Sequence, residues 1–305
     1  MRVLDKAGTV FIDYAPRDGE WGRPEIERTA LRELLIASLD PGRIAWGHKV
    51  AHVSPLGGGR HALTFADGGS VSADLVVGAD GTWSKVRPLL SAATPKYCGI
   101  AHLELRISDV KERHPDCAAL VGPGIFFALS DNKALMAHGG RHIYLGALLR
   151  APEDWTAAVG VDWSDAAAAR EALLTVFDDW SAGLTNLIRN SDDTILPRPI
   201  YALPTDHSWV RTPGVTLLGD AAHVMSPFAG EGANLAMLDG AELALAMAQH
   251  NGDVESALSQ YEATMFPRSM AAAARSAAGL ERCFAADAPR EMVGRFAAMG
   301  IPRAR

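Results

Sequence analysis

The stretch of residues 215–234 constrains the fold of this chain more than any other. Four apolar residues at 215–218 predict a short buried strand. Asp220 follows at a position that caps a helical turn, and the apolar spacing from Ala233 onward predicts a helix. The turn between them contains Pro227, Gly230 and Gly232. A strand, an acid, a glycine-rich turn and a helix N-terminus together make a site for a ligand with hydroxyl groups and anionic character.

This stretch resembles the second flavin-binding motif of the class A flavoprotein monooxygenases, the family built like p-hydroxybenzoate hydroxylase. The resemblance implies FAD as cofactor, with Asp220 on a ribityl hydroxyl and the helix N-terminus facing the flavin ring. Such a terminus can stabilise the negative charge of a reduced flavin. One departure is Glu231, where many relatives carry Gln. An ordinary strand–turn–helix with a capping aspartate is the alternative. The resemblance assigns Gly219, Asp220, Pro227, Gly230, Gly232 and Asn234 to the cofactor.

Length and composition are those of an ordinary globular protein. The 305 residues suffice for one large domain or two modest ones, and the net charge of −7 argues against nucleic acid as a partner. The three cysteines are widely spaced, so they predict neither a disulfide framework nor a metal site. Because no signal peptide and no long apolar run is present, we expect a cytoplasmic protein without a membrane partner.

An amphipathic helix is predicted from Glu27 onward, after a strand at residues 8–13 and a turn at Asp18-Gly19. Arg28 lies in its first turn, where a cation opposes the helix dipole. The family resemblance implies that Arg28 contacts the FAD, and a solvated surface arginine is the alternative. The apolar face of this helix consists of Leu31, Leu34, Leu35 and Leu39.

A second motif follows a buried strand at residues 75–77. A tight turn closes that strand, and ligands of parallel sheets gather at such strand ends. The turn resembles the Asp-Gly motif that serves both FAD and the reduced nicotinamide cofactor in the family, which assigns Asp80, Gly81 and Arg87 to the cofactor. A plain turn would also use Asp-Gly. Earlier strands are predicted at residues 44–46, 62–65 and 71–75.

From about residue 98 apolar and polar residues alternate, which predicts an antiparallel sheet with one dry and one open face. The resemblance implies that this sheet is the substrate domain, which roofs the flavin. Within the family, residues 22–28, Trp155, residues 161–162 and residues 227–230 look most like the tetracycline destructases. Glu104 and Tyr144 depart from that group, which has Gln and His there. The resemblance assigns Glu104, Met136, Tyr144, Gly146 and Phe228 to the substrate.

The fold class expected is α/β, an incomplete FAD/NAD(P)-binding Rossmann-like domain with an antiparallel substrate domain and C-terminal helices. We divide the chain into 1–97 with 188–262 for the cofactor, 98–187 for the substrate, and a helical segment at 263–305. One long helix is predicted at 254–282. The family's first motif, a strand followed by Gly-x-Gly-x-x-Gly, is absent. We therefore expect a true start upstream or a fragment, with the pyrophosphate cradle and central strands missing.

The function predicted from the resemblance is FAD-dependent hydroxylation of an aromatic or polyketide-like small molecule. The resemblance implies NAD(P)H as reductant, molecular oxygen as co-substrate, a flavin C4a-hydroperoxide as oxidant, and a monomer or weak homodimer. No catalytic side chain and no metal ligand is assigned. His223 could act as a general base, but a structural histidine behind the turn is the favoured interpretation. The alternative function is an N-terminally truncated, inactive remnant or a ligand-binding protein.

Overall fold

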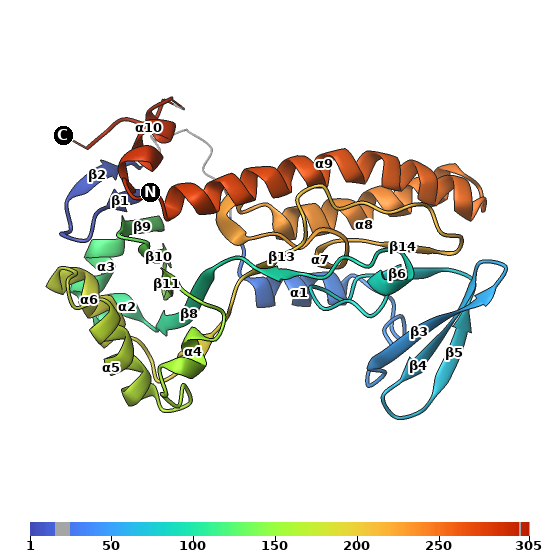
Figure 1. Ribbon diagram of the computed structural model, residues 1–305, viewed down its shortest axis with the longest axis horizontal. Helices are drawn as coiled ribbons and strands as arrows, with labels where there is room; N and C mark the ends of the chain where they lie inside the picture. The colour runs from blue at the N-terminus through green and yellow to red at the C-terminus, as the bar shows by residue number, and fades with distance from the viewer. Residues whose placement is uncertain (16–24, 299, 305) are drawn as a thin grey trace.

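The computed structural model describes residues 1–15, 25–298 and 300–304. The molecule is elongated, with a large sheet and its helices at one end and a small sheet at the other (Figure 1). Helices α8 (Gly232–Gln249) and α9 (Val254–Cys283) run along the length between them. This is the mixed α/β fold predicted from the sequence. The predicted turn at Asp18-Gly19 and residues 22–24 of the resemblance lie outside the described residues.

The large sheet has seven strands in the order β12-β8-β11-β10-β9-β1-β2. Its central strands are antiparallel, as the alternation predicted. One face packs on helices α3 (Pro115–Val121), α5 (Ala166–Val176) and α6 (Ala182–Arg189). The core between them includes Leu103, Phe126 and Phe177, each fully buried. The strands are β1 (Arg2–Leu4), β2 (Val10–Asp13), β8 (Ile100–Ile107), β9 (Gly124–Ser130), β10 (Lys133–Gly139), β11 (Ile143–Arg150) and β12 (Leu196–Pro197).

The first two strands belong to this sheet, which differs from the predicted division of the chain at residue 97. Strand β1 pairs in parallel with β9, and β2 pairs with β1 at the sheet edge. Val3 and Ile12 are fully buried there, so apolar burial holds the N-terminal strands against the sheet. Residues 1–13 therefore extend the predicted substrate sheet and not the cofactor region.

The cofactor region predicted from the sequence is built on two parallel strands, β6 (Val76–Gly78) and β14 (Val215–Leu217). Strand β14 leads into the short helix α7 (Asp220–His223), the 3₁₀ turn η2 (Pro227–Ala229) and then α8. The long predicted helix is confirmed as α9, which continues through Pro267. The hydroxyl of Tyr261 on α9 donates to the carbonyl of Leu217 at 3.0 Å, and this bond ties the helix to the strand end.

The small sheet contains β3 (Val50–Gly57), β4 (Arg60–Phe65) and β5 (Ser70–Ala73). The predicted strand at residues 44–46 is wrong, because these residues lie in an irregular connection and Trp46 is 64% exposed. The leucine-rich helix is α1 (Arg28–Ala37), and none of its residues is buried. The remaining elements are η1 (Arg87–Leu89), β7 (Lys96–Tyr97), α2 (Val110–Arg113), α3 (Pro115–Val121), α4 (Trp155–Ala158), α5 (Ala166–Val176), α6 (Ala182–Arg189), β13 (Tyr201–Ala202) and α10 (Arg290–Ala298).

None of the helices in the described ranges combines the length and the apolar character that a bilayer span requires.

Candidate functional site

The Asp220 carboxylate is exposed at the start of α7 and faces the beginning of α8. Gly219 takes a left-handed conformation with φ of 58°, which only glycine adopts without strain and which turns the chain into α7. The predicted capping role of Asp220 is wrong, since its side chain caps no amide. A Cβ added at Gly232 would lie 4.0 Å from Asp220 Oδ1. In the described part of the chain no side chain or amide bonds this carboxylate, which leaves it available to a ligand hydroxyl.

The N-terminus of α8 has no side-chain cap. Glu231 occupies the cap position, yet its carboxylate makes no cap hydrogen bond and is paired with Arg275 of α9 instead. Gly230 has φ of 68° and closes the preceding turn. Asn234 is exposed in the first turn of α8. The first amides of α8 thus point their partial positive charge outward beside Asp220.

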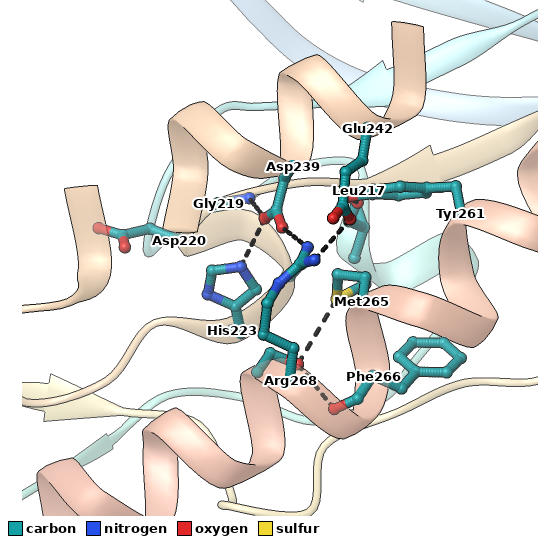
Figure 2. A network of polar contacts seen from close by, with 12 residues as sticks. Leu217, Gly219, Asp220, His223, Asp239, Glu242, Tyr261, Met265, Phe266 and Arg268 are labelled. Atoms are coloured by element: carbon teal, nitrogen blue, oxygen red, sulfur yellow. Dashed lines mark hydrogen bonds and ion pairs between the residues drawn. The ribbon is translucent and has the colours of Figure 1, made fainter. Parts of the chain in front are cut away.

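A buried ionic network holds this turn from behind. The Asp239 carboxylate, which is fully buried on α8, accepts a hydrogen bond from the Gly219 amide at 2.9 Å and contacts His223 Nε2 at 2.6 Å. Its other oxygen accepts from Arg268 of α9 at 2.8 Å. Figure 2 shows Asp239 linked to both His223 and Arg268, with the Asp220 carboxylate directed away from this network. His223 therefore helps to hold the turn, and its interpretation as a structural histidine remains a prediction.

The electrostatics of Asp239 show how tightly this network is organised. Burial by itself would raise the pKa of the Asp239 carboxyl, but the hydrogen bonds from His223, the Gly219 amide and Arg268 outweigh it and hold the pKa below its usual range. Asp239 is consequently an anion at neutral pH. A buried anion with three donors fixes the positions of all three, because the loss of any one would leave charge uncompensated.

The Asp80 turn packs directly on this site through Arg87. Asp80 accepts hydrogen bonds from Ser84 Oγ and the Lys85 amide, both at 2.6 Å, and so closes its own turn. Arg87 is 3% exposed and donates to the carbonyls of Ala221 at 2.8 Å and Thr82 at 2.9 Å. The guanidinium joins the two predicted cofactor turns through their backbones. Contact of Asp80, Gly81 and Arg87 with a cofactor remains a prediction.

Arg28 is the first residue of α1 and is exposed. No hydrogen bond or ion pair joins its guanidinium to another residue in the ranges that the structure covers. The start of α1 is nevertheless tied to the large sheet, because the Tyr144 hydroxyl donates to Glu27 Oε1 at 3.0 Å. This bond places the predicted cofactor arginine near the open face of the sheet.

Four of the predicted substrate residues, Glu104, Met136, Tyr144 and Gly146, lie on the open face of the large sheet. Register pairs Met136 with Gly146, and Gly146 with Glu104, in one row across three strands. Tyr144 lies two residues along β11, where the Arg106 guanidinium stacks over its ring at 5.4 Å. The register thus brings together residues that the resemblance assigns to the substrate, and their contact with a substrate remains a prediction.

The open face is polar at the Glu104 row. Glu104 Oε2 lies 3.3 Å from Arg198 Nε, and both side chains are at least half exposed. A Cβ added at Gly146 would lie 2.8 Å from His102 Nε2, so the glycine makes room for the imidazole. Burial lowers the pKa of His102, and Glu104 acts in the opposite direction. The face therefore offers a carboxylate and a neutral imidazole side by side.

Phe228 connects the cofactor turn with this face of the sheet. Its ring packs edge-on against Phe284 at 5.7 Å and belongs to the same apolar cluster as Met136 and Phe127. An added Cβ at Gly279 of α9 would lie 2.7 Å from the Phe228 carbonyl oxygen, so the turn rests directly on that helix. The residues predicted for the cofactor and for the substrate are thus brought to one region of the molecule.

Several residues of this region were missed by the sequence reasoning. Asp239 carried a signal, since it is a lone acid within an apolar part of the helix predicted from Ala233. His102 also carried a signal, because the alternation along its strand places it on the same face as Glu104. Arg268 and Arg275 carried none, because they bond residues 29 and 44 positions away.

These residues fit the ribityl and ring portions of a flavin. The unpaired Asp220 carboxylate matches a hydroxyl donor, and the uncapped α8 terminus matches the electron-rich edge of the ring. Residues 205–276 match the FAD binding domain family, which supports this fit.

Proteins with similar sequence or fold include a named monooxygenase and an enzyme whose crystal structure contains FAD. The chain is 33% identical over 290 residues to Monooxygenase asqM of Emericella nidulans, covering 80% of this chain and 65% of the relative's length. The fold matches Klebsiella pneumoniae HpxO complexed with FAD and uric acid (TM-score 0.73, 21% identity, 90% of this chain and 67% of that one). It also matches tetracycline destructase Tet(51) (TM-score 0.64, 20% identity, all of this chain and 79% of that one).

Proposed function

We propose that the protein is an FAD-dependent monooxygenase of an aromatic or polyketide-like small molecule. The premise is that residues 205–276 match the FAD binding domain family and that the chain resembles the class A flavoprotein monooxygenases. NAD(P)H is the proposed reductant and molecular oxygen the proposed co-substrate. The observation that carries the proposal is the exposed, unbonded Asp220 carboxylate next to the uncapped N-terminus of α8.

In this proposal each element of the site has a binding role. Asp220 accepts a hydrogen bond from a ribityl hydroxyl, and the first amides of α8 face the ring and favour negative charge there. The Asp239 network and Arg87 keep both turns in place. When bound, FAD supplies the redox chemistry that passes electrons from the reductant to oxygen. The protein's own contribution is orientation and exclusion of water.

The substrate lies, in this proposal, between the cofactor turn and the open face of the sheet. Phe228, Phe127 and Met136 form its apolar wall, which suits a ring system. Glu104 presents a carboxylate that accepts hydrogen bonds, and its contact with Arg198 is long and exposed. A substrate that carries an N–H or O–H group on one ring edge matches this carboxylate, whereas an acidic edge is repelled.

The sharpest test of cofactor binding is Asp220→Ala. Loss of one charged hydrogen-bond acceptor should weaken FAD binding by about tenfold to a hundredfold. The free energy of unfolding of the apo chain should change by less than about 0.5 kcal/mol, because the carboxylate holds no other part of the described structure. Flavin fluorescence titration measures the first and urea unfolding the second. Asp74→Ala, which breaks an exposed ion pair with Arg60, is the matched control.

Unchanged FAD affinity in Asp220→Ala would remove the basis of the proposal. Catalysis is tested separately, by oxygen consumption with NADH or NADPH in the presence of candidate ring compounds. Product that carries one atom from ¹⁸O₂ supports the monooxygenase. A chain that binds FAD yet consumes no oxygen with any reductant supports the alternative of a ligand-binding protein.

A further inference from the structure

Helix α9 holds the cofactor turn through contacts on one of its faces. The Ser276 hydroxyl hydrogen-bonds the Ser226 carbonyl, and the two serine hydroxyls lie 2.7 Å apart. Both serines are buried. One turn farther along, Gly279 lies against the Phe228 backbone, where any side chain would clash. The turn that precedes α8 is therefore seated on small residues of α9.

The third contact on this face is ionic. Arg275 Nε donates to Glu231 Oε1 at 2.9 Å and Nη2 donates to Oε2 at 2.6 Å, the paired geometry that Arg forms with carboxylates. These hydrogen bonds lower the pKa of the Glu231 carboxyl below its usual range. Glu231 is thus an anion at neutral pH, although it sits where the sequence resemblance places an uncharged Gln in many relatives.

The position of Glu231 makes its partner important. An unpaired carboxylate at the start of a helix is attracted to the first amides and to the positive end of the helix dipole. Here the Glu231 side chain makes no such cap bond, because both of its oxygens bond Arg275. The amides of α8 therefore stay free, and these are the amides that the proposed function assigns to the flavin ring.

We propose that Arg275 is a positioning residue for the cofactor, which withdraws and neutralises the Glu231 carboxylate so that the N-terminus of α8 remains open to the flavin. The inference rests on the proposed function for the identity of the ligand, but the withdrawal of Glu231 belongs to the apo chain itself. Without Arg275, the freed carboxylate caps the α8 amides. It also places a negative charge beside the ring.

The apo chain provides the first test. In Arg275→Gln, amide hydrogen exchange at Ala233 and Asn234 should slow, because the freed Glu231 side chain caps the helix. In the double variant Arg275→Gln with Glu231→Gln, exchange should return to the wild-type rate. Glu281→Gln breaks another ion pair of α9, that with Arg150, and serves as control with no change at residues 233–234. Unchanged or faster exchange in Arg275→Gln overturns the proposal.

The FAD-loaded protein provides the second test. Arg275→Gln should weaken FAD binding by about threefold to tenfold and lower the flavin midpoint potential, since a negative charge disfavours the reduced, anionic ring. Removal of the charge in the double variant should restore both values. A double variant as impaired as the single one assigns Arg275 to packing alone and overturns the proposal. If the wild-type chain binds no FAD, the proposed function fails, and the exchange measurement still decides the role of Arg275.

Discussion

The two halves of the molecule are stabilised in different ways. The sheet half, β1, β2 and β8–β12 with α2–α6, has an apolar core, and its buried polar side chains within the described residues are Thr185 and Ser191. The cofactor half, β6, β14 and α7–α9 with the loops between them, buries charged and polar groups along with its apolar residues. These are Ser84, Arg87, His207, Thr216, His223, Ser226, Asp239, Glu262, Ser269 and Ser276.

Glu262 illustrates the difference. This α9 residue is 4% exposed, accepts hydrogen bonds from Trp209 Nε1 at 3.0 Å and Thr216 Oγ1 at 2.7 Å, and pairs with Arg211. It therefore ties the loop before β14, and β14 itself, to the long helix. In the cofactor half a single buried carboxylate thus connects a loop, a strand and a helix. In the sheet half such connections are made by pairing between neighbouring strands.

The contrast follows from what each half has to present. Burial of apolar side chains is non-directional and scales with the area removed from water, so it stabilises the sheet half without fixing the position of individual polar groups. A ligand site needs turns whose amides and carboxylates stay unbonded, and apolar packing specifies such a shape poorly. Directional bonds to Asp239 and Arg87 specify it well, because each fixes a backbone atom of the turn. The comparison predicts that the two halves respond differently to mutation and to pH.

The largest effect is expected in the sheet half, for Phe126→Ala. The ring is fully buried on β9, so its loss should lower the free energy of unfolding by about 3–5 kcal/mol. Urea unfolding measures this, and hydrogen exchange should show lost protection in β8–β11 with little change in α8. Val210→Ala, at an 86% exposed side chain, is the control. Equal loss of protection in both halves would mean that they unfold as one unit, which would contradict the proposed difference between them.

A somewhat smaller effect is expected in the cofactor half, for Asp239→Asn. The amide keeps the shape but removes the charge that pairs with Arg268, and it alters the contact with His223, which together should cost roughly 3 kcal/mol. Protection should fall at residues 219–223 and in α8 while β9 and β10 keep theirs. Asp193→Asn, which removes the charge of a 91% exposed carboxylate paired with Arg170, should have little effect. A loss confined to the sheet half would contradict the assignment of the network.

Acid should distinguish the halves by a smaller amount. The pKa of Asp239 is lowered in the folded chain, so its stabilising contribution is complete above the unfolded value of about 3.9 and disappears as pH falls through the folded pKa. Between pH 5 and pH 3 the wild type should therefore lose more stability than Asp239→Asn does. Urea unfolding of both proteins at the two pH values measures the difference. Parallel pH profiles would show that Asp239 is not a strong anion in the fold.

The sheet half was the easier half to predict from sequence. Alternation with period two is a local pattern, and it predicted the strands β8 to β11. The grouping of Glu104, Met136 and Gly146 was implied by the family resemblance and not by the alternation. The parallel pairing of β1 with β9 could not be predicted, because its partners are more than 120 residues apart and a three-residue strand has no period. Trp46 misled the strand prediction, since a lone aromatic residue in a short apolar run has no preferred face.

In the cofactor half, the turn was predictable and its supports were not. Glycine at 219 and 230 is required by positive φ, so the residue type itself carried the signal. The ties to Asp239, Arg268 and Arg275 depend on how α8 and α9 pack, and charge in the sequence does not name its partner. The same limit applied to Asp220, whose capping role was predicted from position alone but whose carboxylate faces outward.

The smallest effect concerns the link between the halves at α1. Tyr144→Phe removes one hydrogen bond to Glu27 at a partly exposed site, which should cost less than about 1 kcal/mol. Because no residue of α1 is buried, this bond should matter more for the helix than for the whole fold. Exchange in α1 should therefore accelerate, while Tyr201→Phe, which removes a similar bond to Glu153, leaves α1 unchanged. Unaltered exchange in α1 would show that Arg28 is placed by contacts other than the Tyr144 hydroxyl.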